Sequence, residues 1–420
     1  QRASPTLAVA AERLEAARAA ATSAGAALQP LAEATGSTQL TRPDPGAPIS
    51  RRLAVGVQAS WEIDLFGQLA AAQGAARARV EAALSAWHDG RVSLAAEVAS
   101  SYVALRGCEA QLALAGIDAD SRAETARLTA LSAGAGFLAP SEAALARASA
   151  AQARSQQAQT RLACDRQVKA LVALTDWPDA ELRRRLQDAH GQVPVIEPVP
   201  VPAVPARLLE RRPDLLEAQA RLRAAAADVV RTDRDRLPRL SLSGQIGAGL
   251  SLGSRSGGTG STWSLGPLQV SLPVLEGGIQ AANERATMAA YDSARVQLEA
   301  RVRDAVRDVE LALLAVQGSS ARLADAREAA EGFEAALRAA QARQRGGLAS
   351  LFELEDARRQ AVAARQSLID LDQQRATAWV SLYRALGGGW SPADPGPAAP
   401  TGPTATASPA APPASAAGRS

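Results

Sequence analysis

The stretch that decides the fold is residues 51–67, RRLAVGVQASWEIDLFG. Apolar side chains occupy the odd positions from Leu53 to Leu65, and polar side chains such as Gln58 and Glu62 recur at even positions. This alternation predicts a long β-strand with one apolar face and one polar face. The sequence around it is rich in Ala and Arg, which favour helices. A strand of this kind in a mainly helical chain needs a function of its own.

Composition restricts the classes of protein that fit. The chain has 420 residues, of which 47% are hydrophobic but only 3% are aromatic. Small residues at this density favour close-packed long helices. The net charge is +3, and the Arg residues are interleaved with Asp and Glu along helix faces, which predicts a solvated surface and no nucleic-acid partner. The sequence has no apolar run of about 18 residues, so no transmembrane helix is predicted.

The chain repeats itself. SPTLAVAAERLEAA at 4–17 is similar to RPDLLEAQARLRAA at 212–225, and further on Gly67 matches Gly278. The sequence pattern of each repeat predicts, in order, a helix, two strands, a very long helix, a Gly turn and a closing helix. The first repeat is predicted over 1–177, with strands at about 31–65 and a helical hairpin at about 68–176. The second is predicted over 211–390, with strands at about 239–274 and a hairpin at about 279–386.

Helix lengths predict how these elements stack. At 1.5 Å per residue the long helix spans roughly 100 Å, the closing helix about 55 Å and the opening helix about 35 Å. We therefore expect the closing helix of one repeat and the opening helix of the next to stack end to end beside a long helix. The Pro- and Val-rich stretch 178–210 is predicted to wrap the helical layer as an equatorial linker, and the Pro/Ala-rich tail 391–420 to be disordered.

The predicted strands have the length of membrane-spanning strands. They run for about 10 to 13 residues, and the last one shows a phase slip near Pro267. A sheet in lipid cannot leave open edges, and four strands cannot close a barrel alone, so several chains must contribute to one barrel. The polar side chains of Glu62, Asp64, Ser243 and Gln245 would then line a wet lumen. A soluble sandwich with the same alternation is the alternative.

Five stretches carry a resemblance to a known family: SWEIDLFGQ (60–68), ERRPDLLEAQARLRAA (210–225), LPRLSLSG (237–244), RQRGGLASLFELEDARRQ (343–360) and SLYRALGGGW (381–390). In combination they resemble the TolC-type outer-membrane efflux factors, in particular the OprM-like lipoprotein branch. The family's signal peptide, lipidated Cys and leading segment are not found ahead of the first repeat. The resemblance implies a mainly α fold with a membrane β-barrel. It implies a homotrimer with a twelve-stranded barrel in the outer-membrane lipid and a twelve-helix α-barrel in the periplasm of a Gram-negative cell.

The same resemblance implies a function. The trimer would be the exit duct of a tripartite efflux system, with a periplasmic adaptor and an inner-membrane RND-type transporter, and drugs are the expected cargo. A duct for type I protein secretion is the first alternative. A soluble periplasmic coiled-coil adaptor is the second, although an adaptor would show one helical hairpin between lipoyl-like β-halves.

The resemblance also places a gate. Turns at Gly136 and Gly347 are expected at the periplasmic tip. Phe352 and Asp356 are four residues apart and share a helix face. They match positions that in OprM-like proteins carry an apolar residue and an Asp at the constriction. A ring of Asp356 carboxylates in a trimer would favour cations.

The gate prediction has alternatives. Glu353 and Glu355 could supply the acidic ring instead of Asp356. Alternatively, Asp356 simply faces solvent and Phe352 is packed.

Two cysteines fall at matching heights. Cys108 lies 28 residues before Gly136 and Cys164 lies 28 after it. In a hairpin that turns at Gly136, equal rise puts them level. A disulfide requires Cα atoms about 5.5 Å apart, whereas helix pairs usually lie about 8–10 Å apart, so two buried thiols remain the alternative. A disulfide would lock the first hairpin and leave the second, with Ser319 and Arg375 at the matching positions, free to move.

Catalytic motifs are not apparent. His88 and His190 lie far apart without partners at ligand spacing. The sequence shows no nucleophile–base set and no phosphate-binding loop. We predict a protein that is not an enzyme and binds no metal or cofactor.

Overall fold

The computed structural model describes residues 4–42, 49–196, 211–252, 258–275, 277–391, 394 and 396–397. Most of the predicted tail and residues 197–210 of the predicted linker lie outside these ranges. The helices are α1 (Pro5–Ala26), α2 (Gln68–Gly134), α3 (Pro140–Thr175), α4 (Asp179–Arg185), the short 3-10 helix η1 (Gln187–Ala189), α6 (Pro213–Arg234), α7 (Ile279–Ala321), α8 (Leu323–Arg345) and α9 (Leu351–Ala385). The strands are β1 (Leu31–Thr41), β2 (Ser50–Ile63), β3 (Arg239–Leu252) and β4 (Gly258–Ser271).

The four strands form one antiparallel sheet in the order β1-β2-β3-β4. Trp61 pairs with Leu242 and Val57 with Ile246, whereas Gln58 pairs with Gln245. Directly opposed residues project from the same face. One face is therefore apolar and the other polar, as the alternation predicts. The slip predicted near Pro267 is confirmed as a bulge, because the β3–β4 register shifts between Leu242 and Gly244.

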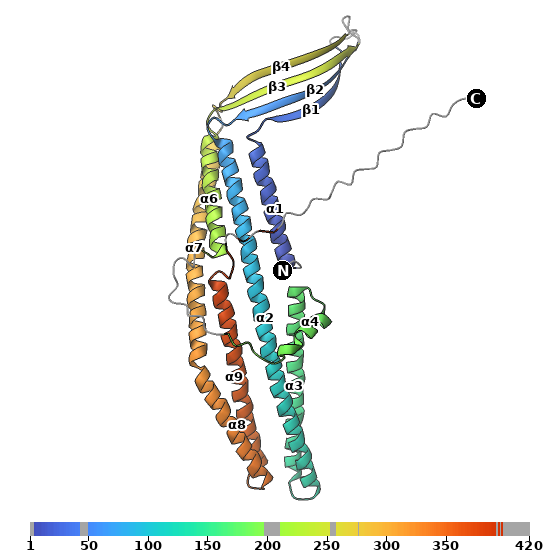
Figure 1. The fold of residues 1–420 in the computed structure, drawn as a ribbon, viewed down its shortest axis with the longest axis vertical. Helices are drawn as coiled ribbons and strands as arrows, with labels where there is room; N and C mark the ends of the chain where they lie inside the picture. Colours follow the sequence, from blue (N-terminus) through green and yellow to red (C-terminus); the bar gives the residue numbers. More distant parts are fainter. Residues whose placement is uncertain are drawn as a thin grey trace, which may run out of the picture.

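The helices form a thin layer below the sheet, and α2 runs through its middle (Figure 1). In the upper part α2 packs against α1 and α6, and in the lower part against α3 and α9. The interfaces are built largely from alanines, and a cluster near the lower end includes Ala126, Ala146, Ala150 and Ala340. Such small side chains allow helices to approach closely, as the composition predicts. Among the described residues, no helix is long and apolar enough to cross a membrane.

The stacking prediction is wrong in its partners. α6 stands above α9 of its own repeat, and α1 stands above α3 (Figure 1). Arg212, just before α6, donates to the carbonyl of Ala385 at the end of α9, at 3.0 Å. Gly387 then passes so close that a Cβ there would lie 3.3 Å from the Arg212 Cα. Length alone could not distinguish the two arrangements, since α3 and α9 have nearly the same length.

The second long helix is also not continuous. α7 ends at Ala321 and α8 begins at Leu323, whereas we expected one helix over this range. Gly318, Ser319 and Ser320 precede the break. Gly and Ser are poor helix formers and are common at kinks.

Candidate functional site at the sheet face and the helical tip

The polar face of the sheet collects three of the four residues predicted to line a lumen. Gln245 lies opposite Gln58, Ser243 opposite Ser60, and Glu62 opposite Ser241. The structure thus brings Glu62, Ser243 and Gln245 onto one face, away from the apolar side chains.

Asp64 is placed differently from our prediction. β2 ends at Ile63. The carboxylate of Asp64 accepts hydrogen bonds from the backbone N–H groups of Leu69 and Ala70, at 3.1 and 2.8 Å. These N–H groups belong to the first turn of α2, where a carboxylate satisfies unpaired donors and the helix dipole. Asp64 is therefore a helix cap at the base of the sheet, and its assignment to the lumen-facing strand is corrected.

The two Gly turns lie at the end of the molecule that is farthest from the sheet (Figure 1). Gly136 and Gly347 have φ of 81° and 72°, a conformation that favours glycine. The backbone N–H of Phe137 donates to the carbonyl of Ser132 at 2.9 Å, and the backbone N–H of Leu348 donates to the carbonyl of Arg343 at 2.8 Å. Both turns therefore close a helix in the same way, as expected of two repeats.

Phe352 is exposed and Asp356 is half-buried in the single chain. Phe352 is 70% exposed, so it is not a packed core residue. The Asp356 carboxylate accepts from Arg359 and from Gln360, both at 2.8 Å, and these partners lie on its own helix. Both residues lie in the first turns of α9, close to the tip, and are free to face a neighbouring copy or a lumen.

Glu353 and Glu355 differ from Asp356. Glu353 accepts from Arg343 across the α8–α9 turn, and its backbone N–H donates to the capping hydroxyl of Ser350 at 3.2 Å. Glu355 points into the helical layer, where its side chain is only 14% exposed. Of the acidic side chains considered for the ring, Glu355 is therefore the one that is largely buried, whereas Glu353 and Asp356 pair with Arg343 and Arg359 and remain partly exposed.

A network that we had not predicted joins the two hairpins near the tip. Glu355 of α9 accepts from Arg122 of α2 at 2.8 Å and from Ser149 of α3 at 2.9 Å. Arg122 also pairs with Asp118 at 2.9 Å. The i, i+4 spacing of Asp118 and Arg122 was a signal in the sequence, but nothing there linked it to α9.

Arg358 extends this network, which we call the tip latch and which consists of Asp118, Ser121, Arg122, Thr125, Ser149, Glu355 and Arg358. Arg358 is 2% exposed, contacts Glu355, and donates to the hydroxyls of Ser121 and Thr125, both at 3.1 Å. Burial lowers the pKa of Arg358, and the Glu355 charge opposes that shift. A buried guanidinium depends on its partners, so the latch holds α9 against α2 and α3.

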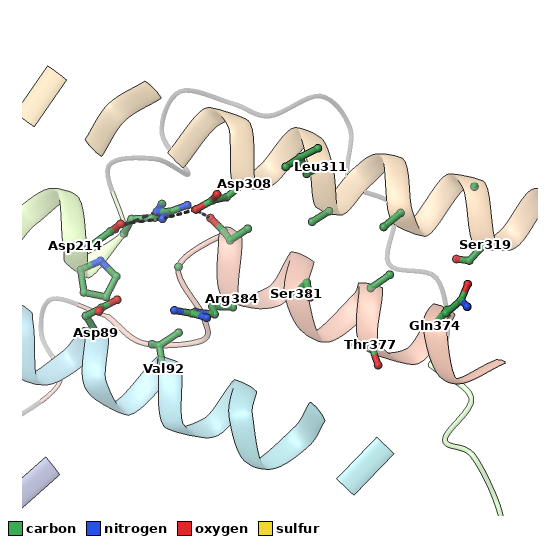
Figure 2. Close-up of a pocket in the computed structure, with 18 of the residues that line it drawn as sticks. Asp89, Val92, Asp214, Asp308, Leu311, Ser319, Gln374, Thr377, Ser381 and Arg384 are labelled. Carbon is green, nitrogen blue, oxygen red and sulfur yellow. Dashed lines mark hydrogen bonds and ion pairs between the residues drawn. The ribbon is translucent and has the colours of Figure 1, made fainter. Parts of the chain in front are cut away.

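A polar cleft of about 1010 Å³ lies at mid-height, where α6 stands on α9 (Figure 2). Arg212 is 8% exposed beside it and forms paired bonds with Asp214 at 2.8 and 3.0 Å. Burial, followed by the Asp214 charge, raises the pKa of Asp89 on α2. Within the described ranges, no group of His, Cys, Asp and Glu could hold a metal ion. The cleft marks the joint between the upper and lower helices.

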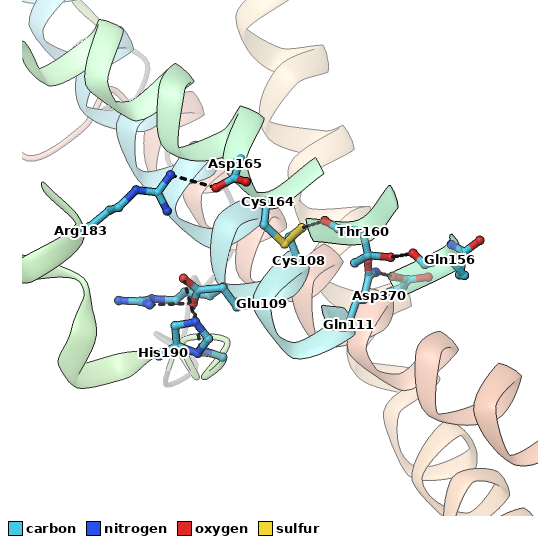
Figure 3. Close-up of a disulfide and its surroundings, with 12 residues drawn as sticks. Cys108, Glu109, Gln111, Gln156, Thr160, Cys164, Asp165, Arg183, His190 and Asp370 are labelled. Atoms are coloured by element: carbon cyan, nitrogen blue, oxygen red, sulfur yellow. Dashed lines mark hydrogen bonds and ion pairs between the residues drawn. A yellow bond between two sulfur atoms is a disulfide. The ribbon is translucent and has the colours of Figure 1, made fainter. Parts of the chain in front are cut away.

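Cys108 and Cys164 form a disulfide, with Cα atoms 5.5 Å apart (Figure 3). It joins α2 to α3 in a core with Leu105, Val168, Leu171 and Leu182. Of the two alternatives left open by the sequence, the structure therefore has the bridge.

The chain that follows α3 is anchored beside this disulfide. Arg106, 1% exposed, pairs with Glu109 and donates to the carbonyl of Leu186, both at 2.7 Å. Glu109 also accepts from the backbone of Gly191 at 2.9 Å. The disulfide level is thus also where the linker leaves the hairpin.

The repeated hairpins and the two-faced sheet match a known family of membrane proteins. The family model described as "Outer membrane efflux protein" matches residues 1–175 and 204–388. The chain belongs to the outer membrane efflux protein family. It is therefore a protein of the outer membrane that acts in efflux, and the family resemblance of the sequence is confirmed.

Individual members of the outer membrane efflux protein family are similar to this chain in sequence and in structure. Outer membrane protein OprJ of Pseudomonas aeruginosa is 32% identical over 333 residues, which cover 79% of this chain and 68% of OprJ. The toluene efflux pump outer membrane protein TtgI of Pseudomonas putida is 29% identical, over 82% of this chain and 72% of TtgI. The solved structure of the outer-membrane channel OprN has a TM-score of 0.83 at 29% identity, covering 92% of this chain and 88% of OprN. These relatives are transport proteins and favour neither the secretion duct nor the adaptor.

Proposed function

We propose that three copies of this chain form a continuous exit duct, through which a tripartite pump expels small organic molecules such as drugs. The relatives support this class of cargo, since one is named for toluene efflux and another for antibiotic efflux. A wide polar duct makes few specific contacts, so selection among cargoes belongs to the pump.

The observation that carries the proposal is a sheet with two unlike faces and two unpaired edges. Trp263 and Leu265 on the apolar face are 79% and 77% exposed. Within the described residues, β1 and β4 each have a neighbour on one side only. Lipid covers an apolar face but cannot satisfy unpaired backbone groups, so β4 of one copy would pair with β1 of the next. Three chains of four strands give a twelve-stranded barrel with the polar face inside.

The edges of the helical layer support the same assembly. Leu145 and Leu162 on α3 are 51% and 53% exposed, and Leu311 and Leu314 on α7 are 56% and 63% exposed. These helices flank the layer on opposite sides of α2 and α9. Apolar side chains on both edges suit contacts between successive copies around a ring, which would close an α-barrel.

The gate is assigned to the tip. In a trimer, Phe352 and Asp356 of each copy would face the bore and form an apolar ring and an acidic ring. The tip latch would keep α9 against α2 and α3 in the closed state, and opening would require these bonds to break. The turns at Gly136 and Gly347 would meet the periplasmic adaptor and the RND-type transporter.

Mass measurement in mild detergent tests the assembly. We expect a protein mass of about 130 kDa, three times the 43.3 kDa of one chain. A folded monomer would expose both helix edges and both sheet edges. A stable, dispersed monomer near 43 kDa would contradict the proposal.

A further inference from the structure

The chain crosses back over the first repeat after α9. The strap, as we call it, consists of residues 386–391, 394, 396 and 397. A Cβ on Gly388 would lie 2.8 Å from a methyl group of Val92, so the strap backbone lies directly on α2. Gly396 lies against Leu84 of α2 and Leu14 of α1 in the same way. The strap thus ties the end of the second repeat to the helices of the first.

His88 of α2 sits beneath the strap. The ring of Trp390 stacks on it with centroids 4.5 Å apart and an interplanar angle of 21°. Trp87 meets it at 5.0 Å in an edge arrangement. His88 is 2% exposed, and neither ring nitrogen has a hydrogen-bond partner among the residues that the structure describes. A neutral imidazole tolerates this apolar site better than an imidazolium, which would bury a charge and two N–H donors.

On balance, the charges and the burial around His88 disfavour the protonated form of its ring. Arg91 of α2 lies over the Trp87 ring at 5.0 Å and adds a like charge. Asp394 of the strap is the opposing charge. On α1, Glu15 and Arg18 pair with each other. Burial, followed by Arg91, lowers the pKa of His88, and Asp394 offsets this only in part.

We propose that the strap is a clamp that opens when His88 is protonated. A proton from solvent binds the free lone pair of the ring. Among the residues that the structure describes, neither N–H of the imidazolium has a hydrogen-bond acceptor, so the ring moves out to water and unstacks from Trp390. Stacking a cation on Trp is favourable, but that gain is smaller than the cost of a buried charge without an acceptor. The strap then loosens from α1 and α2. The opening of this clamp does not depend on the trimeric assembly proposed above.

The pH window follows from the direction of the pKa shift. Above the ordinary histidine pKa of about 6.5, His88 is neutral whether the strap is docked or free, and docking is at full strength. Below that value, the free form binds a proton and the docked form resists it, so docking weakens as the pH falls toward the lowered pKa.

Hydrogen–deuterium exchange on the full-length protein in detergent tests the clamp. The reporters are the amides of Gly388 and Gly389, which donate to the carbonyl and hydroxyl of Tyr383 at 2.9 and 2.6 Å. After correction for intrinsic exchange, we expect these amides to exchange about 10- to 30-fold faster at pH 5.0 than at pH 7.5.

The chain has only two histidines, which gives a matched control. His190→Gln, at a 65% exposed side chain, should keep the full pH response. His88→Phe keeps an aromatic stack but cannot be protonated, and should reduce the response to less than about twofold. In the Trp390→Ala variant, the amides of Gly388 and Gly389 should exchange fast at both pH values.

Equal protection of wild type at the two pH values would overturn the clamp, as would a full response in His88→Phe. If His88→Phe does not fold, His88→Leu is judged by the same criterion, and the wild-type comparison stands by itself.

Discussion

At the residue scale, two adjacent carboxylates have different surroundings. Successive residues of a helix point about 100° apart, so Glu355 faces α2 and α3 while Asp356 points about 100° away from that direction. Glu355 belongs to the tip latch, whereas the partners of Asp356 among the described residues are side chains of its own helix. The first would hold the tip together, and the second would select ions within it.

Substitution of the two carboxylates should separate these roles. Asp356→Ala should raise single-channel conductance and reduce cation preference, with little change in stability, because an exposed pair contributes at most about 1 kcal/mol. Glu355→Ala should also raise conductance, but it removes the carboxylate that pairs with the buried Arg358 and one of the two carboxylates that pair with Arg122, and should cost roughly 3 kcal/mol. Planar-bilayer recording and thermal unfolding measure the two effects.

Glu124 provides the control for these variants. It is exposed on α2, and among the described residues its ion-pair partner is Arg127. Glu124→Ala should leave conductance unchanged. Asp356→Ala channels with wild-type conductance and selectivity would remove Asp356 from the gate.

At the element scale, the two hairpins are built alike but are not equally constrained. α2 is unbroken over 67 residues and is joined to α3 by the disulfide. The corresponding helix of the second repeat is broken after Gly318–Ser320, and Ser319 and Arg375 stand where the first repeat has its cysteines. Opening should therefore move the second hairpin, which carries Asp356, more than the first.

Removal of the disulfide should weaken the first hairpin. Cys108→Ala with Cys164→Ala should lower the free energy of unfolding by roughly 4 kcal/mol, as expected when a bridge that spans 56 residues is lost. Ser319→Ala, at the equivalent position of α7, should change stability by less than about 1 kcal/mol. Chemical unfolding in detergent measures both.

Thiol titration of denatured, unreduced protein is the direct check on the bridge. We expect no free thiol. Two free thiols per chain would refute the disulfide, together with the unequal movement of the hairpins.

At the scale of the whole molecule, both the sheet and the helical layer expose apolar side chains to the surroundings. The described residues of a single chain leave both the apolar sheet face and the edges of the layer uncovered. Family membership places the chain in the outer membrane, and in the trimer that we propose, lipid and neighbouring copies would cover these surfaces.

Neighbouring positions of β2 provide a test of which face meets lipid. Val55 lies on the apolar face opposite Ala248, and Ala54 on the polar face opposite Gly249. Val55→Arg should cost about 2–4 kcal/mol in the bilayer and reduce the amount of assembled protein in outer membranes. Ala54→Arg should assemble as wild type. Equal assembly of the two variants would contradict the assignment of the faces.

The sequence alone determined the features that depend on local periodicity and on length. Alternation from Leu53 to Leu65 gave the strand and its two faces, and internal similarity gave the repeated order of elements. Equal spacing from Gly136 put Cys108 and Cys164 at one height, because helical rise is constant.

The tertiary structure decided what depends on the rotation and pairing of helices. Rise per residue fixes height but not direction, so the sequence could not say that the cysteines meet or that Glu355 faces Arg122. Helix lengths left open whether α6 stands on α3 or on α9, and the contact of Arg212 with Ala385 decides it. The stacking of Trp390 on His88 joins residues about 300 positions apart, and no local pattern of helix or strand reports a contact over that distance.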